Sequence, residues 1–303
     1  MHSFTTGVVT DEIDQDLERA CDVAVELGMR VVEINSLWGG PSDRLTPADV
    51  ARAREIVGQR GLRIDAIGTL ALKALELQQH PHLARSAEFA EHLETIRRAA
   101  FVAHALGASS DQPAVRIFSF RRESMKDLGN PSPIHADGGG LPEATLARIA
   151  EGLTMACDVA RAEGVLLYLE NVRSCWANTG LHTARILKAV DRPELRVIWD
   201  VANDFVSCGQ SYHEGYDATR PHIACVHIKD ARIVHRPTGL TAWTAVGEGE
   251  VDIRGQLAAL ARDGCTAPLL LETHWRGEGM SSEQSSRTSF AGLVAAMQHV
   301  AGG

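Results

Sequence analysis

The stretch VLLYLENVRSCWANTGLHTARILKAVDRPELRVIWD, residues 165–200, contains a strand, a helix and a second strand in that order. Val165–Glu170 and Leu195–Asp200 are continuous apolar runs that each end in a carboxylate, and Thr183–Val190 has helical spacing. Continuous apolar runs are typical of strands covered on both faces, as in a parallel sheet. The stretch therefore predicts a β-α-β unit with carboxylates at the carboxyl ends of its two parallel strands.

The same alternation extends along the chain in both directions. Further strands are predicted at Gly7–Val9, Arg30–Asn35, Leu62–Ile67, Ala114–Phe120, Ile223–His227 and Pro268–Glu272. Further helices are predicted at Leu17–Leu27, Thr46–Gly61, Ser86–Leu106, Glu143–Glu163, Tyr216–Arg220, Arg254–Asp263 and Ser286–Val300. Eight strand and helix units predict a single-domain (β/α)8 TIM barrel of α/β class over residues 1–303, because closure removes both sheet edges. The alternative is a doubly wound open sheet, but no glycine-rich turn follows the first strand.

Composition limits the class of protein and its partners. The net charge of −9 argues against a nucleic-acid partner, which would require clustered basic residues. The six cysteines form no C-x-x-C pair, which is typical of reduced cysteines in a cytoplasmic protein. The sequence has neither a signal-peptide pattern nor an apolar run of about 18 residues, so we expect no membrane association. Two long irregular loops, Gly68–Leu83 and Arg121–Gly140, follow the third and fourth strands and are candidates for lids.

Four successive predicted strands end in residues that can bind a metal: Glu170, Asp200, His227 and Glu272. Each one alone would more commonly be a helix cap, a solvated loop residue or a buried structural histidine. In a parallel barrel, however, all carboxyl ends open on one face, and neighbouring strands are only about 4.8 Å apart. Clustered carboxylates repel one another unless a cation neutralises them. The set therefore predicts one divalent metal ion, with Mn²⁺ or Mg²⁺ best suited to the oxygen-rich site and Co²⁺, Fe²⁺ or Zn²⁺ also compatible.

The segments LYLEN, WDVAN, VHIKD and LLLETH, with VGEGEVD between the last two, resemble the xylose-isomerase-like TIM barrel superfamily. This superfamily includes sugar isomerases, ketose 3-epimerases, inosose and dehydroshikimate dehydratases, and endonuclease IV. The resemblance covers nearly the whole chain. It implies that Glu170, Asp200, His227 and Glu272 bind one catalytic metal, that the substrate is a small carbohydrate, and that the protein forms a dimer or tetramer.

Three positions depart from the ketose 3-epimerases. Asn203 stands where those enzymes have a histidine, and Trp176 stands where they have a second glutamate. Ile233 stands where they have an arginine, although Arg232 lies one residue earlier. The stretch HIKDAR instead resembles the inosose dehydratases and the sugar phosphate isomerase/epimerase group, some members of which act on 3-keto-glycosides.

The resemblance implies a reaction that begins with removal of a proton next to a metal-bound carbonyl. We expect one of Glu170 and Glu272 to take the proton and the other to return one, which gives a sugar isomerase or epimerase acting on a keto-sugar or keto-glycoside through an enediolate. If the intermediate expels a β-substituent, the same site is a lyase, with His274 as the acid. His274 could equally orient a metal ligand.

Candidate substrate-binding residues follow the strand ends: Asn171, Asn203, Lys229, Arg232, Trp38 and Trp176. Trp243 lies in a similar loop, and Lys229 or Arg232 could instead be solvated or paired with a neighbouring acid. Glu33 and Arg116 are expected to point either into the barrel interior or toward its mouth, and they could form a buried ion pair. Two further alternatives stay open: a DNA-repair endonuclease, which would need a histidine-rich trinuclear zinc site, and a non-catalytic binding protein.

Overall fold

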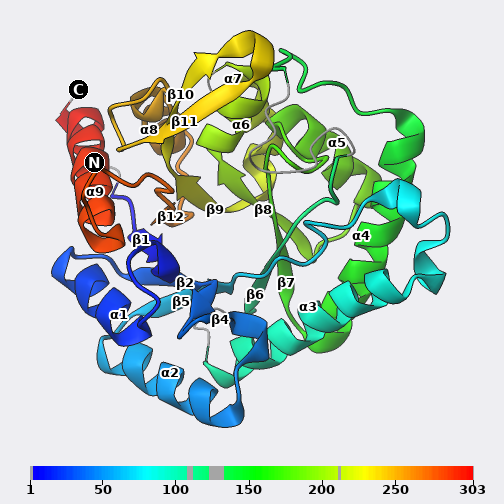
Figure 1. Ribbon diagram of the computed structural model, residues 1–303, viewed down its shortest axis with the longest axis horizontal. Helices are drawn as coiled ribbons and strands as arrows, with labels where there is room; N and C mark the ends of the chain where they lie inside the picture. Colours follow the sequence, from blue (N-terminus) through cyan, green and yellow to red (C-terminus); the bar gives the residue numbers. More distant parts are fainter. Residues whose placement is uncertain (1–2, 108–111, 123–132, 211–212, 303) are drawn as a thin grey trace.

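The computed structural model describes residues 3–107, 112–122, 133–210 and 213–302, and within these residues a closed barrel of eight parallel strands is surrounded by helices (Figure 1). The strands in barrel order are β1 (Thr6–Val9), β2 (Val31–Ile34), β5 (Arg63–Ile67), β6 (Ala114–Ile117), β7 (Leu166–Glu170), β8 (Leu195–Asp200), β9 (Ile223–Ile228) and β12 (Leu269–Leu271). β12 pairs with β1 and closes the ring. The predicted (β/α)8 barrel is confirmed.

The helices that follow the strands cover the outside of the barrel (Figure 1). They are α1 (Leu17–Glu26), α2 (Pro47–Gln59), α3 (Ala87–Ala105), α4 (Glu143–Glu163), α5 (Gly180–Val190), α6 (Val201–Cys208), α7 (His213–Thr219), α8 (Ile253–Arg262) and α9 (Ser282–Gly302). Capping side chains and glycine determine where some of these helices begin and end. Thr46 and Asp49 form a capping box at the start of α2, with Pro47 in its first turn, and Gly164 ends α4 in a left-handed conformation.

The inside of the barrel is filled by side chains rather than left open. One residue from each of seven strands contributes to a buried cluster: Val31, Ala66, Ala114, Tyr168, Ile198, Cys225 and Leu270. The eighth strand, β1, supplies Gly7, where an added Cβ would lie 2.1 Å from the carbonyl oxygen of Val31. This packed layer closes the barrel below its mouth, as is typical of the fold, and leaves the carboxyl ends of the strands free to build a site.

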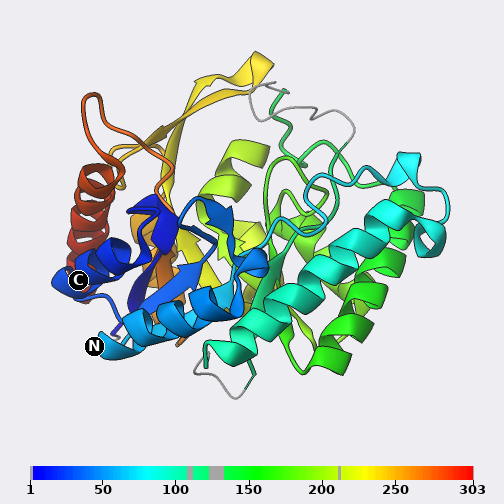
Figure 2. The same ribbon diagram turned by 60° about the horizontal axis from the view of Figure 1, so that its bottom comes forward.

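Two elements near the mouth differ from the sequence expectation. The segment after β9, where the sequence analysis placed Trp243 in a loop, is an antiparallel hairpin of β10 (Asp230–His235) and β11 (Leu240–Thr244), which projects beyond the barrel in Figure 2. Only the base of β10 is buried, so the sequence lacks a clear strand pattern. The second element is α6, which starts directly after β8.

Two further points concern the loops and the helices. The segment 68–83 contains short 3-10 turns, whereas residues 123–132 of the predicted loop Arg121–Gly140 lie outside the described residues. In the part of the chain that the structure describes, no helix combines the length and apolar character needed to cross a bilayer.

Candidate metal centre

The structure brings together the four residues that the sequence placed at strand ends. Glu170 on β7, Asp200 on β8, His227 on β9 and Glu272 after β12 each offer one ligand atom, and these atoms all lie within 4.8 Å of one another. All four residues are buried. The pairing of β8 with β9 helps to explain why these side chains converge, because it places Asp200 directly opposite His227 on the neighbouring strand.

His227 is oriented by the buried carboxylate of Glu33. Its Nε2 is 2.9 Å from Oε2 of Glu33, while its Nδ1 makes no hydrogen bond to a described residue and lies 3.3 Å from Oε2 of Glu272. A proton on Nε2 shared with Glu33 leaves the Nδ1 lone pair facing the carboxylates, which is the arrangement common for metal-bound histidines. Burial lowers the pKa of His227, but Glu272 and Glu33 outweigh this and raise it well above its ordinary value. The position of Nδ1 is therefore one that attracts a cation.

Arg116 on β6 connects three of the carboxylates. Its Nη1 lies 3.0 Å from Oε1 of Glu33, 3.4 Å from Oε2 of Glu170 and 3.3 Å from Oε1 of Glu272. The expected pair of Glu33 and Arg116 inside the barrel is thus present. Burial raises the pKa of Glu170 and so does Glu272, but Arg116 and His227 reverse this and lower it to about 2. Glu170 is consequently ionised at neutral pH.

Lys229, expected to bind substrate, lies among the candidate ligands. Its buried ammonium is 2.8 Å from Oδ2 of Asp200 and 2.5 Å from Oε2 of Glu272. Burial raises the pKa of Glu272, but Lys229, His274 and His227 together outweigh burial and hold the pKa well below its ordinary value. For Asp200, burial outweighs Lys229 and the pKa is raised. Lys229 therefore competes with any other cation for these oxygens.

The charges at this site fit a divalent ion. Four buried carboxylates meet two cationic side chains: Glu33, Glu170, Asp200 and Glu272 on one side, and Arg116 and Lys229 on the other. A metal-bound His227 is neutral, and two negative charges then remain for the ion to balance. Three carboxylates and one imidazole nitrogen form an oxygen-rich donor set suited to Mn²⁺ or Mg²⁺, so the residues present fit such an ion.

His274 belongs to a second group beside the ligands, and it involves a residue that the sequence analysis missed. Its Nδ1 lies 2.6 Å from Oε1 of Glu12, and its backbone N–H donates to Oε2 of Glu12 at 3.1 Å. Arg276 also donates to Glu12, and the His274 ring meets Trp243 edge-on at 5.5 Å. The backbone of His274 is left-handed (φ 50°), a strained state for a residue with a side chain. Glu12 lies just after the end of the first strand, and this position at the mouth of the barrel is the sequence feature that could have identified it as a site residue.

The two predicted asparagines have different environments. Asn203 lines the cavity and donates its Nδ2 to Oε1 of Glu170 at 3.2 Å. Asn171 is fully buried, and its amide both donates to the carbonyl of Asp200 and accepts from the N–H of Asp200, each at 2.8 Å. Asn171 thus joins the ends of β7 and β8 rather than facing a ligand.

Three other predicted substrate-binding residues lie away from the cavity wall. Arg232 is exposed on β10, Trp38 packs against Arg52, and the buried Trp176 packs against Arg122. The hairpin of β10 and β11 turns the Arg232 side chain outward, and the loop tryptophans pack beside arginines. The tryptophan that lines the cavity is Trp243.

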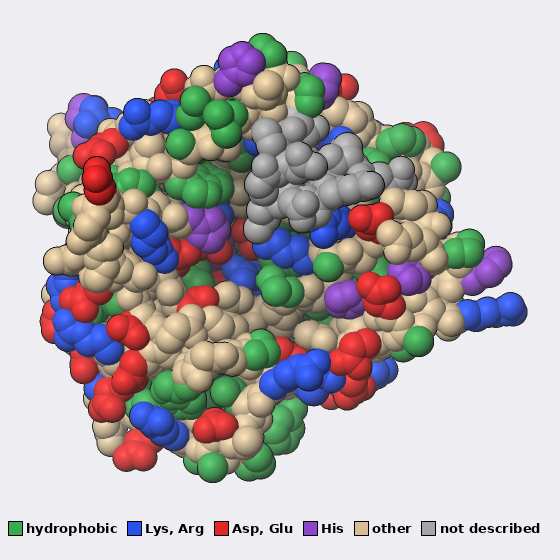
Figure 3. Space-filling view, in the orientation of Figure 1, with side chains coloured by type: hydrophobic (Ala, Val, Ile, Leu, Met, Phe, Trp, Pro, Cys, Tyr) green, Lys and Arg blue, Asp and Glu red, His purple; other side chains and the backbone are tan. Residues whose placement is uncertain are grey.

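A cavity of about 440 Å³ opens above the candidate ligands. Its wall includes Glu170, Glu272, Lys229, His274 and Trp243. Figure 3 looks onto this face, where acidic, basic and histidine side chains gather in a central hollow. A space of this size accommodates a small molecule.

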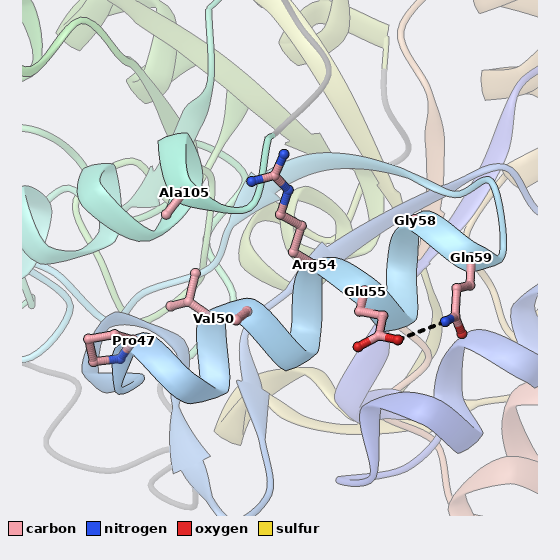
Figure 4. Close-up of a pocket in the computed structure, with 8 residues that line it drawn as sticks. Pro47, Val50, Arg54, Glu55, Gly58, Gln59 and Ala105 are labelled. Atoms are coloured by element: carbon pink, nitrogen blue, oxygen red, sulfur yellow. Dashed lines mark hydrogen bonds between the residues drawn. The ribbon is translucent and has the colours of Figure 1, made fainter.

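A second hollow lies on the helical exterior. Figure 4 shows this groove between α2 and the end of α3, where Glu55 accepts a hydrogen bond from Gln59 of its own helix. The residues that line it bring no cluster of charged groups together, so we place the candidate site at the mouth of the barrel.

Three carboxylates and a histidine at the carboxyl ends of the strands define a class of (β/α)8 barrel that could hold a metal ion at its mouth. Residues 21–294 match the model of a family described as the xylose isomerase-like TIM barrel. The chain belongs to this family, and the predicted resemblance is confirmed. No curated protein matches the chain in sequence.

Several solved structures share the fold. A 3-keto-D-glucoside 4-epimerase from E. coli has a TM-score of 0.69 and 16% identity, over 97% of this chain and 100% of that chain. A xylose isomerase-like TIM barrel protein from Mycobacterium smegmatis, in complex with magnesium, has a TM-score of 0.65 and 18% identity, over 93% and 89%. A protein from Bacillus anthracis described as a probable 3-DHS dehydratase has a TM-score of 0.67 and 16% identity, over 96% and 98%.

Proposed function

We propose that the protein is a divalent-metal-dependent isomerase or epimerase that acts on a keto-sugar or keto-glycoside by removing a proton next to its carbonyl group. The observation that carries this proposal is the convergence of one ligand atom each from Glu170, Asp200, His227 and Glu272 within 4.8 Å, beneath a cavity of about 440 Å³. Structures of the same fold include a keto-glucoside epimerase and a magnesium complex, which supports the reaction class and the use of a divalent ion.

Glu170 and Glu272 are suited to act as the two proton-transfer groups. Both line the cavity, and they reach it from β7 and from the end of β12, with β8 and β9 between them. Their low pKa values keep both ionised, so either can accept a proton. A pair of carboxylates on two sides of one carbon can remove a proton from one face and return it to the other, which is the requirement for epimerisation.

The surrounding residues orient these carboxylates. Arg116 contacts both of them, and Asn203 donates to Glu170. Lys229 contacts Glu272 and lies on the cavity wall, so it can also donate to a substrate oxygen. When bound, the divalent ion supplies Lewis-acid stabilisation of the negative charge that develops on the carbonyl oxygen.

A lyase is the second candidate, and the pairing of Glu12 with His274 favours it. His274 lines the cavity, and a proton on Nδ1 shared with Glu12 leaves its Nε2 for exchange with a ligand. When Nε2 also carries a proton, an imidazole held in this way can give that proton to a departing hydroxyl or alkoxide group and keep the one on Nδ1. A dehydratase is among the proteins of the same fold.

Incubation of the Mn²⁺-loaded protein with a panel of keto-sugars and keto-glycosides in deuterated water tests the proposal. Deuterium uptake without loss of a substituent is the expected result. Loss of water or an alcohol would assign the lyase instead. Absence of both reactions across the panel, with the wild type behaving like Glu272→Gln, would refute the proposed function.

A further inference from the structure

Part of the cavity wall is apolar, although the same cavity contains the charged groups of the candidate site. The described residues with apolar side chains that line it are Leu70, Val172, Val206, Leu240 and Trp243. In Figure 3, apolar side chains border the central hollow. Leu70, in the segment after β5, is 61% exposed, and Leu240, the first residue of β11, is 46% exposed. The proposed proton transfer uses neither leucine.

Exposed apolar side chains gather at this end of the barrel. Among the described residues, four that are strongly exposed lie in segments that follow the carboxyl ends of barrel strands: Leu70, Val234, Leu240 and Met280. The others, Val25, Phe101 and Leu181, are single residues on α1, α3 and α5. Single exposed apolar residues are common and need no explanation, whereas exposed apolar surface inside a cavity marks a place where a ligand binds.

Leu70 is fixed beside the end of β6. The N–H of Phe118, directly after β6, donates to the carbonyl oxygen of Ala71 at 3.1 Å. Phe118 in turn packs in one buried cluster with Val172, which follows β7. Phe118 therefore connects the segment that carries Leu70 to the segment that carries Val172.

The tip of the hairpin brings Leu240 to the same part of the wall. Arg173, directly after Val172, donates from Nη1 to the carbonyl oxygen of Gly239 at 2.8 Å, and Gly239 directly precedes Leu240. Consecutive contacts thus join three segments that follow three different strands. We call Leu70, Val172 and Leu240 the apolar wall.

The apolar wall adjoins the candidate proton-transfer groups. The centre of the Phe118 ring lies 5.6 Å from Cζ of Arg116, and Nη1 of Arg116 lies 3.4 Å from Glu170 and 3.3 Å from Glu272. A sugar held at these carboxylates therefore places one of its substituents against the wall. A hydroxyl group there would give up hydrogen bonds to water and find no partner among the apolar side chains, which is unfavourable.

We propose that the apolar wall is a subsite for an apolar group, aryl or alkyl, that the sugar substrate carries. This inference rests on the proposed function and adds the chemistry of the substituent, which a metal centre alone does not specify. Contact with such a group removes the two exposed leucines from water, and the gain in free energy grows with the apolar area covered. Val172, only 8% exposed, supplies a surface that is already packed in place.

Calorimetric titrations with phenyl, hexyl and methyl D-glucosides, each as both anomers, test the subsite with and without Mn²⁺. We expect at least one phenyl or hexyl glucoside to bind about 10-fold more tightly than the methyl glucoside of the same anomer, a difference of about 1.4 kcal/mol. A preference for phenyl over hexyl identifies an aryl group, and the reverse preference identifies an alkyl group. Equal affinities of all three glucosides, or no binding of any of them, would overturn the proposal.

Substitutions of similar size separate the apolar wall from general hydrophobic binding. Leu70→Gln and Leu240→Gln should each reduce the preference for the apolar glucoside about 5-fold and leave the methyl glucoside unaffected. Leu240→Met, which stays apolar, should keep the preference. Leu181→Gln is the matched control, because Leu181 is 44% exposed on α5 and does not line this cavity.

A preference that survives in both Leu70→Gln and Leu240→Gln would contradict the assignment of the subsite. If these variants instead lower the molecular mass of the protein in solution without changing the preference, the leucines contact a second copy of the chain, and the proposal is wrong.

The binding measurements do not depend on turnover, so the two proposals can fail separately. A leucine-dependent preference, in a protein that exchanges no substrate proton, would contradict the proposed function and leave the subsite intact. Proton exchange on keto-sugars, without any preference for an apolar substituent, would contradict only the subsite.

Discussion

Lys229 holds two of the oxygens that a metal at the mouth of the barrel would need. Its ammonium lies 2.8 Å from Asp200 and 2.5 Å from Glu272, and it is 1% exposed. Replacement by methionine, which has a similar length and no charge, leaves the carboxylates more negative. We therefore expect Lys229→Met to bind Mn²⁺ about 10-fold more tightly, a difference of about 1.4 kcal/mol, in a competition titration with a chelator.

The same variant should have a second effect on the metal-free protein. Removal of one member of a buried ion pair costs about 3–5 kcal/mol, so Lys229→Met without metal should unfold at a lower urea concentration. Lys188→Met serves as the control for loss of a lysine charge. Unchanged or weaker Mn²⁺ binding by Lys229→Met would show that the ammonium and the ion do not share oxygens.

Glu12 is predicted to act through His274 and not on the metal. Glu12→Gln weakens the contact that fixes the His274 ring but leaves all four candidate ligands in place. For the lyase reaction, in which His274 is the acid, we expect a fall in turnover of about 10²-fold, the lower range for a mispositioned proton-transfer group, with Mn²⁺ affinity within twofold of the wild type. A parallel loss of Mn²⁺ affinity would instead place Glu12 in support of the metal centre.

At the residue scale, the sequence predicted the residues whose position follows from strand order. Glu170, Asp200, His227 and Glu272 end successive strands, so parallel topology alone brings them to one face. Contacts between residues far apart in sequence could not be predicted in this way. Glu12 and His274, whose side chains are hydrogen-bonded, are 262 positions apart in the sequence. This contact depends on the left-handed backbone conformation at His274, which no local sequence pattern indicates.

The helix α6 shows how a local element supports the site. Asp200 begins α6 by accepting a hydrogen bond from the N–H of Asn203 at 2.7 Å, and Asp204 in the next turn accepts from the N–H of Gly180 at 2.8 Å. Gly180 is the first residue of α5. Asp204 therefore connects two helices through a carboxyl group that is 3% exposed.

This connection predicts a pH dependence of stability. Burial raises the pKa of Asp204 from 3.8 to about 7. Between these values the unfolded chain loses the proton and the folded protein keeps it, so the free energy of unfolding should fall as pH rises, by at most about 4 kcal/mol. Asp204→Asn keeps an oxygen for Gly180 but cannot ionise. We expect it to exceed the wild type in stability at pH 8 and to match it near pH 4 in urea unfolding.

The wild type and Asp204→Asn differ in one ionisable group. The contributions of all other ionisable groups to the pH dependence of the free energy of unfolding therefore cancel when the two proteins are compared. Equal losses of stability between pH 4 and pH 8 in the two proteins would contradict the assignment of this slope to Asp204. A parallel measurement on Asp217→Asn, at an exposed site in α7, checks for a general effect of charge.

At the element scale, the sequence predicted strands and helices best where burial is continuous. β8 and α4 have the bounds expected from their apolar patterns. The hairpin of β10 and β11 was missed because its outer residues are exposed and show no alternation. α6 was missed because a helix that begins directly after a strand leaves no loop residues to mark its start.

At the scale of the whole molecule, stability and chemistry occupy different ends of the barrel. The packed interior layer, which draws one residue from each of seven strands, lies below the site and needs no ligand. The candidate ligands come from four neighbouring strands on one side, β7, β8, β9 and β12. A bound ion would therefore join elements that span residues 166–272, while the opposite side of the barrel would be held by packing alone.

This arrangement predicts that a divalent ion stabilises a fold that already forms without it. Arg116 and Lys229 neutralise part of the carboxylate charge, so the metal-free protein should be folded. Saturating Mn²⁺ should then raise the melting temperature, since an ion at 100 times its dissociation constant adds about 2.7 kcal/mol.

Asp200→Asn is the sharpest comparison for this stabilisation, because asparagine can still cap α6 but lacks the ligand charge. It should therefore fold in the absence of metal and show little or no Mn²⁺-dependent shift in melting temperature. A shift as large as that of the wild type would exclude Asp200 as a ligand. If Mn²⁺, Mg²⁺ and chelators all leave the melting temperature of the wild type unchanged, the result would count against any metal at the mouth of the barrel.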